Sequence, residues 1–316
     1  MKAKTIKLII GRKFSRLLES IEDESIRKIV EENTIVTGGC ITSMLLNENV
    51  NDFDLYFRTH DAALKIANYY VTKFKANPPT SFPSGHGVEI GILDETTRIK
   101  IKVKSAGVAG EKGSNDYQYF ETLPPEQGEE AGSEFVNQAI NNANDLDEES
   151  EKKLDEENSK KPKYRPIFLT CNSITLSNQI QLVVRFFGEP EVIHESYDYV
   201  HCTNYWTSWD KTLVLRPEAI ESILNKDLRY MGSLYPICSI IRSRKFIKRG
   251  WSITAGQYLK MAFQISKLNL EDINVLEDQL VGVDTAYFAQ LIEVLQKKDP
   301  QRVDGAYLMS IIDKVF

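Results

Sequence analysis

Residues 34–57 restrict the fold of this chain more than any other stretch, because a β-branched segment leads there into a Gly-Gly pair and an apolar run. Residues 34–36, Thr-Ile-Val, suit a buried strand, since β-branched side chains pack well on a pleated surface. Gly38 and Gly39 can adopt backbone angles forbidden to other residues, and the apolar residues of 41–45 repeat with helical spacing. The glycines are therefore predicted at a helix N-terminus, where N–H groups and the helix dipole favour a phosphate.

Two aspartates follow this predicted helix. Asp52 and Asp54 are two residues apart, so in a strand both carboxylates lie on one face while Phe53 and Leu55 point into the core. Two neighbouring carboxylates repel each other and are stabilised by sharing divalent cations, of which Mg²⁺ is the usual one. A Gly-Gly turn or an Asp-x-Asp strand alone is common, but the two in this order predict a site for phosphate and metal.

The same residues resemble a known family signature. Gly38-Gly-Cys-Ile-Thr-Ser-Met-Leu-Leu46, followed by Asp52-Phe-Asp54, is similar to the GGxVRDxLLG and DxD motifs of the nucleotidyltransferase superfamily, in its CCA-adding enzyme and bacterial poly(A) polymerase branch. The resemblance implies an α+β head domain in which Asp52 and Asp54 are catalytic and bind two Mg²⁺ ions. It also implies that Gly38, Gly39, Thr42 and Ser43 contact the nucleotide, although Thr42 and Ser43 replace the family's Arg and Asp.

Two later segments extend the resemblance. Ser196-Tyr-Asp-Tyr-Val-His-Cys-Thr-Asn204 is similar to the family's RRDFTINA segment, which assigns nucleotide contacts to Asp198 and Asn204. The stretch from Cys238 to Ile253 resembles the neck helix, which assigns phosphate contacts to Arg242 and Lys245. Residues 226–250 hold seven Lys or Arg against one Asp, which suits either a solvated basic face or contacts to triphosphate and RNA. Asn51-Asp-Phe-Asp-Leu-Tyr-Phe57 and Tyr235-Pro-Ile-Cys-Ser239 resemble phage-encoded members of the superfamily.

The sequence departs from the family at two places that matter for chemistry. The family commonly places a third carboxylate on a later strand, where this chain has Gln181 in a segment without an acid. An amide neither binds Mg²⁺ as a carboxylate does nor accepts a proton, and Glu89 is our candidate replacement. The nucleotide-selecting EDxxR signature is also absent, since the sequences beginning at Glu271 and Glu277 lack its Arg.

Composition limits the environment and the partners. The net charge is −6, but residues 106–161 carry fifteen acidic and five basic residues, which leaves +4 for the rest and keeps a nucleic-acid partner open. Four separated cysteines without a CxxC pair argue against a zinc site and a disulfide framework. No run of eighteen apolar residues and no signal-peptide core occur, so we expect a cytoplasmic protein without a membrane partner.

Periodicities along the chain predict a head domain over residues 1–216 and an all-helical neck and body domain over 217–316. The acidic segment 106–161 is expected to be a mobile insertion that interrupts the sheet of the head. Alternating residues predict a hairpin at 87–104 and further strands up to residue 186, while amphipathic patterns predict helices, whose ranges follow. The predicted helices are 13–32 as one or two, 60–77, 217–224, 236–248, 255–268, 271–280, 285–297 and 303–316.

Three functional hypotheses follow from these residues. The first is a metal-dependent nucleotidyltransferase that transfers NMP from an NTP to an RNA 3′ end, with tRNA as the first acceptor to consider. The second keeps this chemistry but modifies a protein or a small nucleotide, as toxin-like members do. The third is a degenerate member that only binds RNA or protein, which the missing third carboxylate favours.

Overall fold

The structure is a computed structural model that describes residues 1–78, 88–95, 97–105, 164–170 and 172–270, together with residues 272, 275 and 279. The chain divides into two compact units. The first comprises Met1–His194 and Cys202–Ala219, and the second comprises Glu195–His201 and Ile220–Phe316. The acidic insertion and the helices predicted at 271–280, 285–297 and 303–316 fall outside the described ranges, apart from those three residues.

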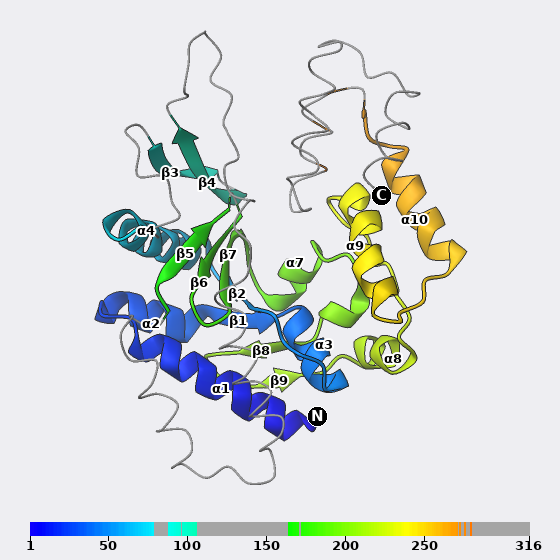
Figure 1. Ribbon diagram of the computed structural model, residues 1–316, viewed down its shortest axis with the longest axis horizontal. Coiled ribbons are helices and arrows are strands. Elements are labelled where there is room, and N and C mark those ends of the chain that lie inside the picture. Colours follow the sequence, from blue (N-terminus) through cyan, green and yellow to red (C-terminus); the bar gives the residue numbers. More distant parts are fainter. Residues whose placement is uncertain are drawn as a thin grey trace. The chain divides into compact units, whose positions relative to one another are not determined.

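The first unit is built on a mixed seven-stranded sheet with the order β5-β6-β7-β2-β1-β8-β9 (Figure 1). Strand β2 pairs in parallel with β7, and every other pair of neighbours in this sheet is antiparallel. Because β2 lies between β1 and β7, residues far apart in the sequence meet at its start. The strands of this sheet are β1 (Thr34–Thr37), β2 (Phe53–Phe57), β5 (Pro166–Leu169), β6 (Ser173–Leu176), β7 (Ile180–Phe187), β8 (Tyr205–Thr207) and β9 (Leu213–Val214).

Two helices precede the sheet, as predicted, but the first begins earlier than expected. Helix α1 spans Ala3–Glu19 and α2 spans Glu24–Asn33. The prediction started at residue 13, whereas buried Ile6 extends the apolar stripe of α1 toward its N-terminus. Asp23 separates the helices, since its carboxylate accepts hydrogen bonds from two backbone N–H groups at the start of α2.

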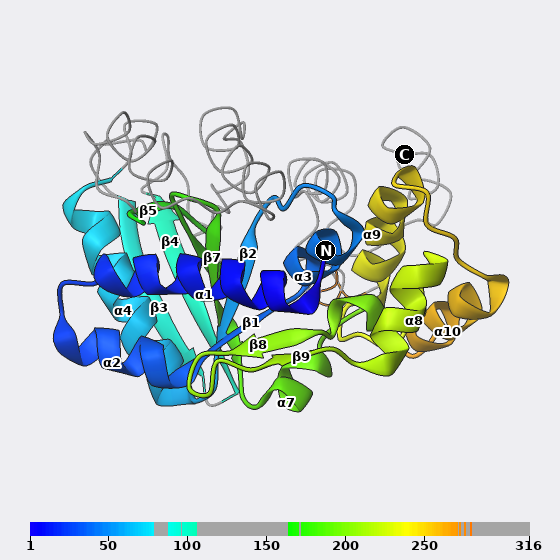
Figure 2. The same cartoon turned by 90° about the horizontal axis from the view of Figure 1, so that it is seen from below.

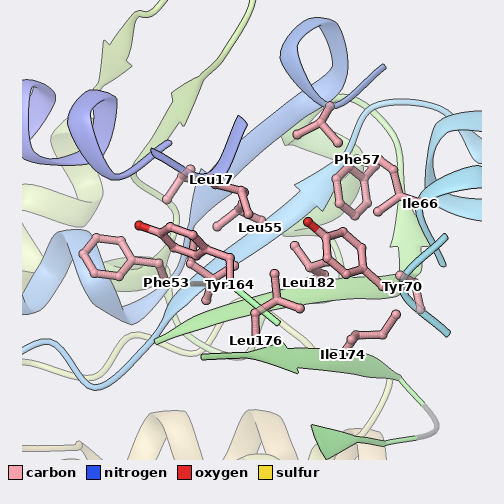
Figure 3. Packing of buried hydrophobic residues seen from close by; sticks show 14 of the residues in the cluster. Leu17, Phe53, Leu55, Phe57, Ile66, Tyr70, Tyr164, Ile174, Leu176 and Leu182 are labelled. Carbon is pink, nitrogen blue, oxygen red and sulfur yellow. The ribbon is translucent and has the colours of Figure 1, made fainter. Parts of the chain in front are cut away.

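Helices α1, α2 and α4 (His60–Ala76) lie on one face of the sheet (Figure 2). Figure 3 shows Leu17 of α1 and Tyr70 of α4 packed near Leu55 and Leu182 of the two central strands. Since side chains alternate along a strand, Asp54 of β2 and Gln181 of β7 point to the opposite face. That face therefore carries the polar residues of the predicted site.

The predicted hairpin forms, but not as part of the main sheet. Strands β3 (Val88–Glu95) and β4 (Arg98–Ser105) pair only with each other among the described residues. Strand β7 already pairs with β6 and β2, so it offers no edge to the hairpin. The hairpin instead buries Ile99 and Ile101 against the core.

The second unit is helical in the part that the structure describes, which confirms the predicted α+β class with a helical C-terminal region. Tyr199, His201, Phe246 and Trp251 pack edge to face and in tilted stacks at its centre. In the described ranges, no helix combines the length and apolar character required to cross a bilayer. The remaining helices among the described residues are α3 (Gly39–Leu46), α7 (Pro190–His194), the 3₁₀ turn Val200–Cys202, α8 (Pro217–Asn225), α9 (Pro236–Lys248) and α10 (Ala255–Ile265).

Candidate active site

The Gly-Gly pair forms the turn between β1 and α3, as predicted. Gly38 has φ 90° and ψ −151°, a conformation that side-chain-bearing residues rarely adopt. Its N–H donates to the carbonyl oxygen of Cys202 at 3.2 Å, which fixes the turn. Gly39 is the first residue of α3, and a Cβ atom added to it would meet nothing within 4 Å. The N-terminus of α3 is therefore open at the position where an anion would approach it.

Strand pairing brings the aspartates to the same end of the sheet as this turn. Thr37, the last residue of β1, is the pairing partner of Asp54 in β2, and Gly38 follows directly. On its other side Asp54 pairs with Gln181 of β7. Asp52 is exposed and Asp54 is half-buried, so both are accessible to ligands.

The side chain of Gln181 lies between the two carboxylates. With its amide nitrogen Nε2 facing them, it donates to Asp52 Oδ2 at 3.3 Å and to Asp54 Oδ1 at 3.0 Å, while its Oε1 accepts from the Ser173 hydroxyl at 2.7 Å. The opposite orientation would point the amide oxygen at carboxylates that offer no proton, so the hydrogen-bond network selects the first. Gln181 is the residue nearest the position at which the family resemblance places a third carboxylate.

The first turn of α3 is electrostatically coupled to the aspartates. Cys40 is 2% exposed, and burial raises the pKa of its thiol, with further contributions from the nearby charges of Asp54 and Asp52. The thiol of Cys40 therefore stays protonated in the folded protein.

Lys13 of α1 is a charged residue near this region that the sequence analysis missed. Its side chain is 5% exposed, and its ammonium lies 4.5 Å from the centroid of the Phe53 ring. Burial, reinforced by Arg16, lowers the pKa of Lys13 to about 7, although Cys40 opposes the shift. The signal was present in the sequence, because Lys13 falls on the apolar stripe of α1 between Ile9 and Leu17.

Three further predicted nucleotide contacts are buried in the first unit. Thr42 and Ser43 lie on α3 and are 2% and 7% exposed. Asn204 is fully buried: its backbone oxygen accepts from Thr37 Oγ1 at 2.9 Å, and its Oδ1 accepts from the N–H of Arg216 at 2.8 Å. Its Nδ2 has no hydrogen-bond partner among the described residues. The structure thus brings Asn204 to the strand that ends at the Gly-Gly turn, and its contact with a nucleotide stays a prediction.

Glu89, the candidate replacement for the third carboxylate, lies on β3 rather than in the main sheet. Its backbone pairs with Lys104 of β4. Glu89 as a third carboxylate stays a prediction, whereas the amide of Gln181 contacts both aspartates.

Asp198, Arg242 and Lys245 belong to the second unit. Arg242 Nη1 donates to Asp198 Oδ2 at 2.5 Å, and the Ser239 hydroxyl donates to Asp198 Oδ1 at 2.7 Å. These two hydrogen bonds of Asp198 connect the loop before the 3₁₀ turn to α9. The sequence did not indicate this structural role. Lys245 is exposed, and its ammonium lies 5.1 Å from the centroid of the Phe246 ring.

The described contacts bring two carboxylates and one amide together at this site. In the part of the chain that the structure describes, no three His, Cys, Asp or Glu side chains are placed to hold a metal ion together. The two carboxylates nevertheless fit a hard divalent cation, because they are negatively charged oxygen ligands and one oxygen of each lies within hydrogen-bond distance of the same amide nitrogen.

Comparisons with known proteins give two matches. The solved structure of the Thermotoga maritima CCA-adding enzyme complexed with tRNA is similar to the chain, with a TM-score of 0.36 and 12% sequence identity. The match covers 92% of this chain and 56% of the enzyme, so the chain spans little more than half the length of that protein. A similarity of this size carries no argument about activity. Among curated proteins no match was found.

A family model described as "Gad2: Gabija anti-defense 2 family protein" matches residues 9–226. The match includes the Gly-Gly turn, Asp52, Asp54 and Gln181, and it extends over more than half of the 316 residues. The chain therefore belongs to the Gabija anti-defense 2 family.

Proposed function

We propose that this chain is a divalent-metal-dependent nucleotidyltransferase. The observation that carries the proposal is the arrangement of the open Gly39 turn and the Asp52–Asp54 pair at one end of neighbouring strands. An NTP needs such a combination, because its phosphates favour a helix N-terminus and its charge requires a cation held by carboxylates. The resemblance of the same residues to the nucleotidyltransferase signature supports this function.

In this reaction a hydroxyl oxygen of the acceptor attacks the α-phosphorus of the NTP. The new O–P bond forms while the bond to pyrophosphate breaks, and the hydroxyl proton is released. When bound, the metal neutralises the negative charge of the phosphates. The chain's own contributions are to orient the triphosphate at the N-terminus of α3 and to hold the carboxylates of Asp52 and Asp54 close together.

The first acceptor that we propose is an RNA 3′ end, with tRNA as the first example, acting in the cytoplasm. The basic residues of α9 support it, because Arg244, Lys245 and Lys248 are exposed and could follow a phosphate backbone. A protein or a small nucleotide is the second acceptor class. The amide of Gln181 cannot accept the proton of an attacking hydroxyl, which favours the third hypothesis, a member that only binds RNA or protein. The family name leads us to propose further that the transfer counteracts the Gabija defence, as a phage protein would.

The test uses α-labelled NTPs and an isosteric control. The protein is incubated with Mg²⁺, each labelled NTP and, in turn, tRNA lacking its 3′ end, protein from cells that carry the Gabija system, or no acceptor. The Asp52→Asn/Asp54→Asn variant removes two charges and keeps the side-chain shapes. We expect label on the RNA with the wild type and a loss of at least about 100-fold in the variant.

Each other labelling result supports or rejects a particular hypothesis. Label on protein or on a small molecule supports the second acceptor class and rejects the first. Equal labelling by the wild type and the Asp52→Asn/Asp54→Asn variant rejects the Asp pair as the site. No label with any acceptor, combined with retention of RNA in a binding assay, supports the binding-only hypothesis instead.

A further inference from the structure

Gln181 is held in place by a directional chain of hydrogen bonds that ends on the aspartates. The Thr170 hydroxyl accepts from the backbone N–H groups of Asn172 at 3.1 Å and Ser173 at 2.9 Å, and lies 2.9 Å from the Ser173 hydroxyl. Because Ser173 gives its proton to Gln181 Oε1, the Thr170 hydroxyl donates to Ser173. Ser173 is 3% exposed, so water does not compete for this bond. The amide is therefore locked with its two N–H protons toward the carboxylates.

This orientation determines what a cation would meet. A carboxylate at position 181 would add two oxygen ligands and a negative charge beside Asp52 and Asp54. The amide nitrogen instead presents only N–H donors, which carry partial positive charge and repel a cation. Two divalent ions at one site carry four positive charges, whereas the described donor set offers two negative ones.

We propose that Gln181 is a positioning residue that bridges Asp52 and Asp54 and restricts the pair to one divalent ion. This inference rests on the proposed function and replaces the two ions that the sequence resemblance implied. The bridge also relieves the repulsion between the carboxylates before any ion binds, because each carboxylate accepts a hydrogen bond from the same amide nitrogen.

Manganese titration tests the number of ions directly. Bound Mn²⁺ loses the sharp paramagnetic resonance signal of the free ion, so the titration counts ions per chain without any activity measurement. We expect one Mn²⁺ for the wild type, two for Gln181→Glu, which supplies the missing ligand, and none at this site for Asp52→Asn/Asp54→Asn. The matched control is Asn178→Asp, which makes the same amide-to-acid change at an exposed position three residues away and should leave one ion.

Thermal unfolding supplies a second readout. Three carboxylates without a cation repel one another, so Gln181→Glu should melt below the wild type in chelator and regain more stability than the wild type when Mn²⁺ is added. If Gln181→Glu does not fold, Gln181→Met still tests the bridge. Met has a similar volume but no N–H donor, so the two carboxylates lose the hydrogen bonds that offset their repulsion, and Gln181→Met should melt below the wild type in chelator.

Different experimental results would contradict this inference and the proposed function. Two ions in the wild type, one ion in a folded Gln181→Glu, or a melting temperature of Gln181→Met in chelator equal to that of the wild type would overturn the role of Gln181 and leave nucleotidyl transfer standing. An absence of Mn²⁺ binding by the wild type, with no difference from Asp52→Asn/Asp54→Asn, removes the metal site and with it the proposed function.

Discussion

The adjacent residues Gly38 and Gly39 have different backbone conformations, so a substitution to alanine should have a different effect at each position. Gly38 has a positive φ of 90°, so Gly38→Ala should lower the free energy of unfolding by about 1–3 kcal/mol. Gly39 is helical and has open space around it, so Gly39→Ala should leave the stability unchanged or raise it by up to about 1 kcal/mol. If a phosphate approaches α3 there, the added methyl group of Gly39→Ala should weaken nucleotide binding by about 10-fold. Urea unfolding and nucleotide titration measure the two effects; unchanged nucleotide affinity in a folded Gly39→Ala would place the phosphate elsewhere.

Lys13 is a residue at which charge opposes folding. Folding lowers the pKa of Lys13 from 10.5 to about 7. Between these two values the side chain is protonated in the unfolded chain and neutral in the folded protein. The penalty is present at pH 7 and below, and it disappears as the pH rises from about 7 toward 10.5. Lys13→Met keeps most of the volume, and we expect it to raise the free energy of unfolding by about 2–4 kcal/mol at pH 7.

The pH dependence distinguishes this cause from a simple packing gain. The advantage of Lys13→Met over the wild type, measured by urea unfolding, should shrink between pH 7 and pH 9.5. An advantage that is constant with pH would indicate packing, and a less stable variant would mean that the ammonium makes favourable contacts in the core.

At the scale of elements, the ion pair between the 195–201 loop and α9 is the connection that we would test. The side chain of Asp198 is 10% exposed and that of Arg242 is 29% exposed, so the pair is only partly screened by solvent. A double-mutant cycle with Asp198→Asn and Arg242→Gln should give a coupling energy of about 1–3 kcal/mol in urea unfolding. Arg244→Gln, on the same helix but exposed, should change the stability by less than about 0.5 kcal/mol. A coupling energy near zero would return Arg242 to the binding role predicted from the sequence.

The elements with strong local patterns could be predicted from the sequence. Helix α9 spans Pro236–Lys248 as predicted, because Pro236 sets its first turn and the apolar residues repeat regularly. Strand β8 was missed, since Tyr205–Thr207 is too short for alternation to show. The separate sheet of β3 and β4 could not be foreseen either, because a hairpin pattern specifies its own pairing but not which edge of another sheet remains available.

The residues of the candidate site also divide into those that a local sequence pattern indicates and those that depend on distant strand pairing. Gly38, Gly39, Asp52 and Asp54 were found because their chemistry depends on close sequence spacing. The bridge by Gln181 depends on a parallel pairing between β2 and β7, whose residues are more than 120 positions apart, and no local pattern encodes the contact. Only the family resemblance pointed to position 181, and it indicated what was missing rather than what the amide does.

For the whole molecule, each compact unit contains, in the part that the structure describes, one buried histidine whose protonation is unfavourable. His194 belongs to the first unit and His201 to the second, and the pKa of each is lowered to about 3. Burial is the main cause in both, followed by Arg216 for His194 and by Lys245 and Arg249 for His201. Both histidines should therefore stay neutral in the folded protein at mildly acidic pH.

The sign of the resulting pH dependence follows from linkage. Below about pH 6.5 the unfolded chain protonates these histidines while the folded protein does not, so each contributes stability that is present above pH 6.5 and is lost progressively as the pH falls toward 3. Each histidine alone should lower the free energy of unfolding by about 2 kcal/mol between pH 7 and pH 5. His201→Phe suits the surrounding aromatic rings of Phe246 and Trp251 and removes the titration, and His194→Gln removes it in the first unit. Urea unfolding at pH 7, 6 and 5 should show that His201→Phe flattens the pH dependence of the second unit alone and that His194→Gln flattens that of the first alone. An unaltered pH dependence in both variants would mean that the histidines accept protons without loss of the fold, in which case carboxylates must account for any acid sensitivity of the protein.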